Sequence, residues 1–367
     1  GKDRGIWLAK YDMEHFKMAG EPVTIFNSAL RVGSSPEAPH LYHIGDYYYL
    51  IIAEGGTEHY HAVMVARSRE IFGFYEANPA NPVMTHRHMG FTSPIINVGH
   101  ADLVELPDGS WYAVMLASRL IDKAYKNLER DWPLFSPETG KVEWEYDAPE
   151  CLPWTEKPKK KSVYEFDAEE LEPEWVFLGT PYEKFYSIRD SRLSIRCIRQ
   201  KLAEELEPMA MTGEKKKDRY VGMLAQRQCA LHTTVSCQMS FLPEGQESAG
   251  LAVVQAMNHQ MHLERAKTDG RQMLRLVLYT SDFNCPPYFP GFESTTHREV
   301  LAEVEWNEKD IVLEIEMDGE MFTFRYGASK EALHVLCTAD GGMINPEKVG
   351  CMTGTVMGMY ASGNGTD

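Results

Sequence analysis

The chain has 367 residues, of which 54 are acidic and 37 basic, giving a formal net charge of -17. This charge would repel nucleic-acid backbones and anionic lipid surfaces, so the sequence argues against nucleic acid and membranes as partners. No apolar run is long enough to span a bilayer, and the first residues lack the apolar core of a signal peptide, so a cytoplasmic location is expected.

Two stretches of the amino-terminal part resemble each other: "APHLYHIGDYYYLIIAEGG" from Ala38 and "HADLVELPDGSWYAVMLAS" from His100. Each consists of an apolar strand, a tight turn and an aromatic-rich strand, and the Gly and Asp of the turns tolerate positive φ. Shorter strands are expected over 6–10 and 62–67. The repeat predicts that residues 1–155 form blades of a β-propeller.

The repeat also relates two polar residues. Glu37 lies four residues before Leu41, and His100 lies three before Leu103, so we expect both at the entrances of equivalent strands. The innermost strands of a propeller start around one axis, and ligands bind there, so the two side chains are expected to converge on one pocket. Asp102, two residues after His100, is expected to be structural.

The strand pattern stops after residue 155, and prolines and a run of lysines predict a linker over 156–172. Residues 173–367 are again rich in strands, including a hairpin that closes on Asp318-Gly319. Apolar residues alternate before that turn, at Ile311, Leu313, Ile315 and Met317. The sequence therefore predicts an all-β chain of two domains, a partial propeller followed by an antiparallel β-sandwich.

Several motifs together resemble glycoside hydrolase family 43, and most closely its β-xylosidase branch: "PEAPHLY", "YYYLIIAEGGT", "HAVMVARS" and "GHADLVE". Farther on, "PEWVFLGTPYEKFYSIRDSRLSIR" and "GMYASGNG" resemble the concanavalin A-like sandwich of that branch. The resemblance covers nearly the whole chain. It implies a five-bladed propeller and inverting hydrolysis of short xylo-oligosaccharides by an exo-acting β-1,4-xylosidase, with no required cofactor.

The resemblance also implies roles for individual residues. Glu37, between two prolines, would be the general acid, and burial beside tyrosine-rich strands would hold it protonated. His100 would contact the sugar and order water on the propeller axis, where calcium is allowed but not required. Arg130 in "NLERDWPLF" would bind sugar hydroxyls, although this stretch departs from the family's "LGRET" pattern. Thr57 is expected in the pocket wall.

In the family, the catalytic base is an aspartate that would precede Gly1, as would the aspartate that orients the acid. We therefore expect a complementary amino-terminal propeller half, as a separate chain or a missing segment. An α-L-arabinofuranosidase is the alternative within the same class. A non-catalytic carbohydrate-binding protein, with aromatic residues such as Tyr288 and Phe289 in its sandwich, is the alternative from another class. Self-association into a homo-oligomer is left open.

Overall fold

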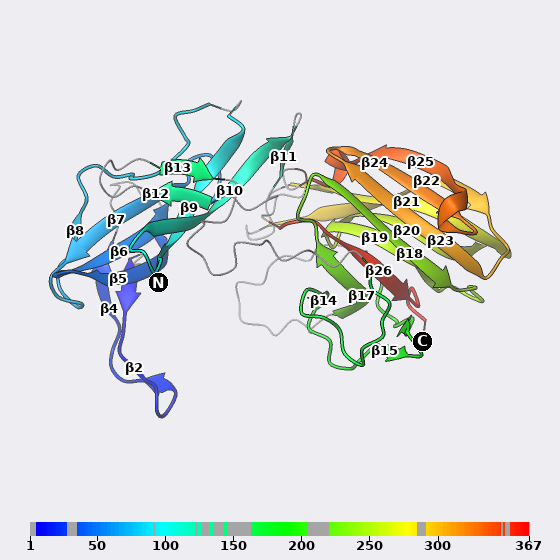
Figure 1. The fold of residues 1–367 in the computed structure, drawn as a ribbon, viewed down its shortest axis with the longest axis horizontal. Helices are drawn as coiled ribbons and strands as arrows, with labels where there is room; N and C mark the ends of the chain where they lie inside the picture. The colour runs from blue at the N-terminus through cyan, green and yellow to red at the C-terminus, as the bar shows by residue number, and fades with distance from the viewer. Residues whose placement is uncertain are drawn as a thin grey trace. The chain divides into compact units, whose positions relative to one another are not determined.

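The chain divides into two compact units, one made of Gly1–Leu120 with Glu129–Lys160, the other of Ile121–Leu128 with Lys161–Asp367. The part that the computed structural model describes is almost entirely β, which confirms the predicted class (Figure 1). None of its helices is long and apolar enough to cross a membrane. The described residues are 5–27, 35–90, 93–121, 124–126, 132–135, 142–145, 163–203, 220–284, 291–345, 348 and 353–366.

Up to residue 145 the chain forms antiparallel hairpins and small sheets. A four-stranded sheet has the order β5-β6-β7-β8, and a five-stranded sheet has the order β11-β10-β12-β13 with β9 paired to β10. Two further sheets, β1-β4 and β2-β3, have two strands each. The strands are β1 (Ile6–Leu8), β2 (Tyr11–Asp12), β3 (Lys17–Met18), β4 (Val23–Phe26), β5 (Glu37–Ile44), β6 (Tyr47–Glu54), β7 (Ala62–Ser68), β8 (Glu76–Ala77), β9 (Ile95–Glu105), β10 (Trp111–Ile121), β11 (Ala124–Lys126), β12 (Trp132–Phe135) and β13 (Val142–Glu145).

Strand β6 is buried on both of its faces. Leu50 and Ile52, each 1% exposed, pack with Ile6 of β1 in one apolar cluster. Ile51, on the opposite face, packs with Ala101 of β9 in another cluster. Because both faces are covered, the strand is a continuous apolar run rather than an alternating one, as its sequence shows. This layering of successive sheets is the arrangement expected of propeller blades.

The first strand of each repeat contains a β-bulge, an extra residue that bends the strand. In β5, Glu37 pairs with Ala53 and His40 with Ile51, so three steps on β5 match two on β6. In β9, Gly99 pairs with Leu116 and Asp102 with Val114, which is the same mismatch. The two sequence repeats therefore share a backbone irregularity as well as a strand pattern.

A residue with positive φ lies within each bulge: Ala38 at 49° and His100 at 55°. These are the first residues of the two aligned repeats. The expectation that His100 stands at a strand entrance was wrong, because β9 begins five residues earlier. Ile95, Ile96 and Val98 are buried and extend the strand upstream, and the chain bulges at His100 instead of starting there.

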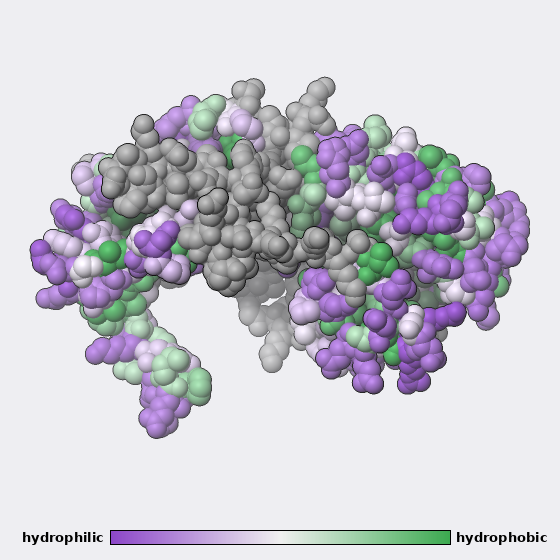
Figure 2. Space-filling model, viewed as in Figure 1, coloured by the Kyte–Doolittle hydropathy of each residue, from purple (hydrophilic) through white to green (hydrophobic). Residues whose placement is uncertain are grey.

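The hairpin of β2 and β3 extends away from the sheets of its unit (Figure 1). Its apolar side chains are visible at the lower left of Figure 2, and Tyr11, Met13, Phe16 and Met18 are between 49% and 76% exposed. The apolar side chains of this hairpin are therefore largely exposed to solvent.

The second unit is a sandwich of two antiparallel sheets, as predicted. The larger sheet has the order β14-β17-β26-β19-β20-β21-β22 and the smaller one β18-β23-β24-β25, while β15 and β16 form a separate hairpin. Residues 156–162 of the predicted linker lie outside the described residues, and 163–172 are described and contain no helix or strand. The elements are β14 (Val176–Gly179), β15 (Tyr186–Arg189), β16 (Arg192–Ile195), β17 (Tyr220–Arg227), β18 (His232–Ser240), β19 (Ser248–Ala256), β20 (His259–Thr268), β21 (Arg271–Phe283), β22 (Ser294–Glu305), β23 (Asp310–Asp318), β24 (Met321–Gly327), η1 (Lys330–Ala332), β25 (Leu333–Asp340), η2 (Gly341–Ile344) and β26 (Val356–Ser362).

The core of the sandwich lies between its two sheets. The alternating residues of β23 face inward and are at most 1% exposed, and they pack with residues of the larger sheet such as Leu263 and Leu274. The period-two pattern therefore identified the buried face of this strand correctly. The four inward-facing residues of β23 are Ile311, Leu313, Ile315 and Met317.

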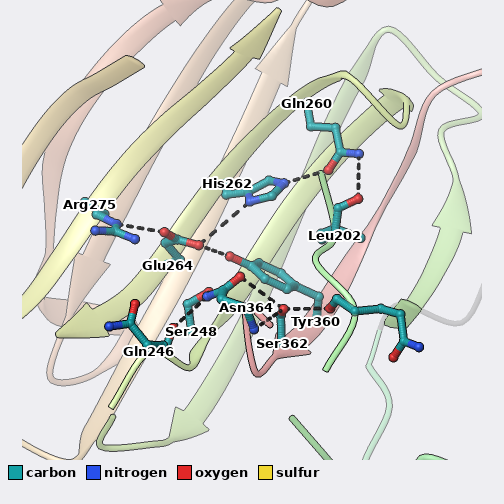
Figure 3. Close-up of polar contacts among 11 residues, drawn as sticks. Leu202, Gln246, Ser248, Gln260, His262, Glu264, Arg275, Tyr360, Ser362 and Asn364 are labelled. Atoms are coloured by element: carbon teal, nitrogen blue, oxygen red, sulfur yellow. Dashed lines mark hydrogen bonds and ion pairs between the residues drawn. The ribbon is translucent and has the colours of Figure 1, made fainter. Parts of the chain in front are cut away.

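A buried polar network occupies the larger sheet, away from that core (Figure 3). The Arg275 guanidinium donates through Nε to Oε1 of Glu264 at 2.7 Å, and the Tyr360 hydroxyl donates to Oε2. His262 Nδ1 lies 3.8 Å from Oε2. Burial acts to raise the pKa of Glu264, but the interactions with His262, Arg275 and Tyr360 outweigh it and lower that pKa to about 2. Glu264 is therefore ionised and fully occupied by these partners.

Candidate active site

Glu37 is the first residue of β5, and the bulge that follows determines its direction. Its cross-strand partner Ala53 and the partner of His40, Ile51, lie two residues apart on β6, so Glu37 and His40 share one face of the sheet. This is the face that packs toward β9. Contrary to expectation, the Glu37 side chain is exposed rather than buried, because at the strand end the neighbouring described residues do not cover it.

Asp102 of β9 is held by two groups of β5. The Tyr42 hydroxyl donates to Oδ1 of Asp102 and accepts from the backbone N–H of Leu103 at 2.7 Å. His40 Nδ1 lies 3.4 Å from the same carboxylate. Burial, and then the hydrogen bond to Asp102, raise the pKa of Tyr42 to about 12, so the hydroxyl keeps its proton at neutral pH. These contacts agree with the structural role expected of Asp102, because they tie two sheets together.

His61, which the sequence reasoning missed, lies at the centre of the site. It immediately precedes β7, is 2% exposed, and its Nδ1 donates to the carbonyl of Asn97 at 2.8 Å. Burial lowers the pKa of His61, so the ring is neutral near pH 7 with its proton on Nδ1. The charge of His100 lowers the same pKa further, and that of Glu37 raises it. Both predicted residues therefore lie within electrostatic range of one buried histidine.

His100 and Thr57 are the other predicted residues that the structure describes. His100 is exposed, and its ring centroid lies 6.4 Å from that of His40. Thr57 is half-buried in the loop between β6 and β7, which ends at His61. Arg130 lies outside the described residues, as do Tyr288 and Phe289. Glu37 and His100 thus both lie within electrostatic range of His61, and Thr57 lies on the loop that ends at His61.

The family resemblance admits a calcium ion near His100 without requiring one. Within the described part of the chain, no group of three or more His, Cys, Asp or Glu side chains is arranged to hold a metal ion. Asp102, the carboxylate two residues from His100, is already engaged by Tyr42 and His40. These residues do not form a calcium site by themselves, and no chemical role is assigned to a cation here.

Two family models match the chain. "Glycosyl hydrolases family 43" matches residues 1–146, and "Beta xylosidase C-terminal Concanavalin A-like domain" matches residues 163–367. Together they cover nearly the whole sequence, and the unmatched stretch 147–162 overlaps only the first part of the predicted linker.

Curated relatives and solved structures agree with these matches. A xylosidase/arabinosidase of Butyrivibrio fibrisolvens is 32% identical over 99% of this chain and 68% of its own length. The non-reducing end alpha-L-arabinofuranosidase BoGH43B of Bacteroides ovatus is 32% identical over 91% of this chain and 60% of its own length. The structure of xylan beta-1,4-xylosidase from Bacillus halodurans superposes with a TM-score of 0.76 at 25% identity, covering 98% of this chain and 68% of that one. The chain thus spans 60% to 68% of the length of these relatives.

Proposed function

Because the chain belongs to glycosyl hydrolases family 43, we propose that it carries the general acid of an inverting glycoside hydrolase and that this acid is Glu37. The observation that supports the assignment is that two motif residues lie within electrostatic range of one buried histidine. Glu37 and His100, which are 63 positions apart in the sequence, both act on the buried ring of His61. A carboxyl group on an exposed strand end beside such a cluster can reach the oxygen of a bound glycoside.

In an inverting mechanism, one carboxylic acid protonates the departing oxygen while a carboxylate on the opposite face of the sugar activates water, about 6.5–9.5 Å away. Glu37 would serve as the acid. Asp102 is a poor base, since its carboxylate already accepts from Tyr42 and pairs with His40. We place the base in an amino-terminal propeller half outside these 367 residues, supplied by a longer form of the protein or by a companion chain.

The proposed substrate is a short β-1,4-linked xylo-oligosaccharide, cleaved from its non-reducing end, with His100, Thr57 and Arg130 binding the glycone. The name of the Bacillus halodurans relative supports a xylosidase, and the name of the Butyrivibrio relative includes both activities. The name of the Bacteroides ovatus relative favours α-L-arabinofuranoside cleavage, which is the second candidate. Paired assays with nitrophenyl xyloside and nitrophenyl arabinofuranoside separate the two.

The test of the acid is the leaving-group dependence of Glu37→Gln, measured in an enzyme preparation that supplies the proposed base. General acid catalysis matters most when the departing oxygen is basic, so we expect turnover of xylobiose to fall about 10²–10⁴-fold. Activated nitrophenyl glycosides should lose much less. Glu105→Gln, an exposed carboxylate of β9, is the control and should behave as wild type.

Equal losses on both kinds of substrate would remove Glu37 from the acid role. Calorimetric binding of xylobiose by the same preparation without any turnover would instead support the non-catalytic carbohydrate-binding alternative.

A further inference from the structure

One ring nitrogen of His61 has no hydrogen-bond partner among the described residues. Nδ1 donates to the Asn97 carbonyl, so Nε2 is a lone-pair acceptor, and among the described residues no donor is bonded to it. The ring is almost fully enclosed, at 2% exposure. An enclosed acceptor without a hydrogen bond is costly, and such groups in native proteins ordinarily have a partner in the functional state.

The backbone next to this nitrogen is unusual. A Cβ atom built on Gly99 would lie 2.4 Å from Cδ2, 2.5 Å from Cγ and 2.6 Å from Nε2 of His61, so only glycine allows the ring to approach so closely. The next residue is His100, in the left-handed conformation within the bulge. Asn97, also left-handed with φ of 59°, turns its carbonyl to Nδ1. Two residues of β9 therefore adjoin the imidazole of His61, Asn97 through its carbonyl at Nδ1 and Gly99 through its backbone beside Nε2.

We propose that His61 is a positioning residue for His100: its Nε2 lone pair accepts a hydrogen bond from a ring N–H of His100. The inference rests on the proposed function, in which His100 binds the sugar. The bond fixes one tautomer of His100. It leaves the other nitrogen of that ring as an acceptor directed toward a sugar hydroxyl, without adding charge to the site.

The hydrogen bond from His100 to His61 explains how an enclosed neutral histidine can orient an exposed one. A carbonyl at Asn97 forces the proton onto Nδ1 of His61, which in turn makes Nε2 an acceptor. The exposed ring of His100 has two tautomers of similar energy in water, and one hydrogen bond is enough to select between them. Because the His100 ring is already oriented before the glycone binds, less conformational entropy is lost on binding.

The kinetic test uses His61→Asn, since the asparagine amide can still donate to the Asn97 carbonyl but has no acceptor at the Nε2 position. We expect kcat/KM to fall about tenfold, the loss of roughly one hydrogen bond, chiefly through KM. The same substitution in a His100→Ala background should cause no further loss, because its effect passes through His100. An unchanged tenfold loss in that background would overturn the proposal.

His86→Asn is the matched control, because His86 Nδ1 likewise lies 2.8 Å from a β9 carbonyl, that of Ile95. In the His86→Asn background, His61→Asn should still lower kcat/KM when His100 is present and cause no further loss when His100 is replaced by Ala. A tenfold loss that appears equally in His86→Asn would show that support of β9 alone is responsible, and would also overturn the proposal.

A second test does not require activity, so it distinguishes this inference from the proposed function. In ¹⁵N-histidine-labelled chain, His61 should show a protonated Nδ1 and an unprotonated Nε2, and His100 a single tautomer, assigned by comparison with His100→Gln. His61→Asn should convert His100 to the mixture of a free imidazole. A mixed tautomer of His100 already in the wild-type protein contradicts the proposed hydrogen bond, whatever the assays show.

Discussion

The hydroxyl of Tyr42 joins two sheets through two hydrogen bonds. It donates to Asp102 and accepts from the N–H of Leu103, both on β9, while its own strand belongs to the neighbouring sheet. The Tyr42 oxygen thus serves as donor to a carboxylate and as acceptor for a backbone N–H at the same time. The contact contributes to stability and also sets the distance between the strands that carry Glu37 and His100.

Tyr42→Phe should lower the free energy of unfolding by about 1–3 kcal/mol, because the part-buried Leu103 N–H loses its acceptor and Asp102 loses a donor. Tyr49→Phe is the matched control on the neighbouring strand, and its hydroxyl makes no recorded hydrogen bond with the described residues. It should cost less than about 0.5 kcal/mol. Urea titrations followed by tryptophan fluorescence measure both, and equal stabilities of the two variants would show that the Tyr42 bonds contribute nothing.

At the scale of single residues, sequence motifs singled out Glu37 and His100 as candidates but not His61. The stretch "HYHAVMV" shows a histidine ahead of a buried strand, which is also how a simple core histidine reads. What distinguishes His61 is its contact with Gly99, and that depends on the packing of one sheet against the next. The exposure of Glu37 could not be predicted either, because the sequence does not show which segments cover the end of a strand.

Among the strands, the bulge of β9 is sensitive to one methyl group. Gly99→Ala would place a Cβ within 2.6 Å of the His61 ring, so the ring or the strand must move. We expect a loss of about 1–3 kcal/mol in unfolding free energy, with a parallel loss of activity. Gly20→Ala, where a Cβ meets nothing within 4 Å, is the control and should be neutral or slightly stabilising. Thermal denaturation checks both, and a fully stable Gly99→Ala would contradict the close packing described above.

Strand type and pairing were largely readable from the sequence, whereas strand irregularities were not. Alternation marked the buried face of β23, and turn residues marked its hairpin with β24 correctly. The repeat predicts a start of β9 that is too late, because the apolar residues from Ile95 onward lie ahead of the repeated segment. Bulges at Ala38 and His100 leave no signal in composition, since neither residue is the glycine that positive φ usually favours.

For the molecule as a whole, the network around Glu264 predicts how stability depends on pH. The folded-state pKa of about 2 lies below the ordinary value of 4.5, so the unfolded chain binds the proton more tightly. The stabilisation is complete above about pH 4.5 and is lost as the pH falls toward 2. Urea midpoints of the sandwich, measured from pH 7 to pH 2.5, should therefore decline through this interval, and a midpoint that stays constant would contradict the assignment.

The same network should respond strongly to removal of its charge. Glu264→Gln leaves the Arg275 guanidinium, only 17% exposed, without its carboxylate, and we expect a loss of roughly 3–5 kcal/mol. Glu316→Gln removes a comparable bond to Arg325 at the surface, where the carboxylate is 42% exposed, and should cost less than about 1 kcal/mol. Chemical denaturation compares the pair. Similar losses of unfolding free energy in the two variants would mean that burial does not increase the contribution of the Glu264 network to stability.

The matching bulges have a consequence for the history of the molecule. Ala38 and His100 occupy the same position of two hairpins whose side chains otherwise differ, and both adopt a conformation that non-glycine residues rarely take. Independent origins would have to arrive twice at the same kink, whereas duplication of one ancestral hairpin would copy it once. The backbone would then be the older inheritance and the chemistry the newer one, with an alanine kept at the kink in one copy and a histidine acquired there in the other.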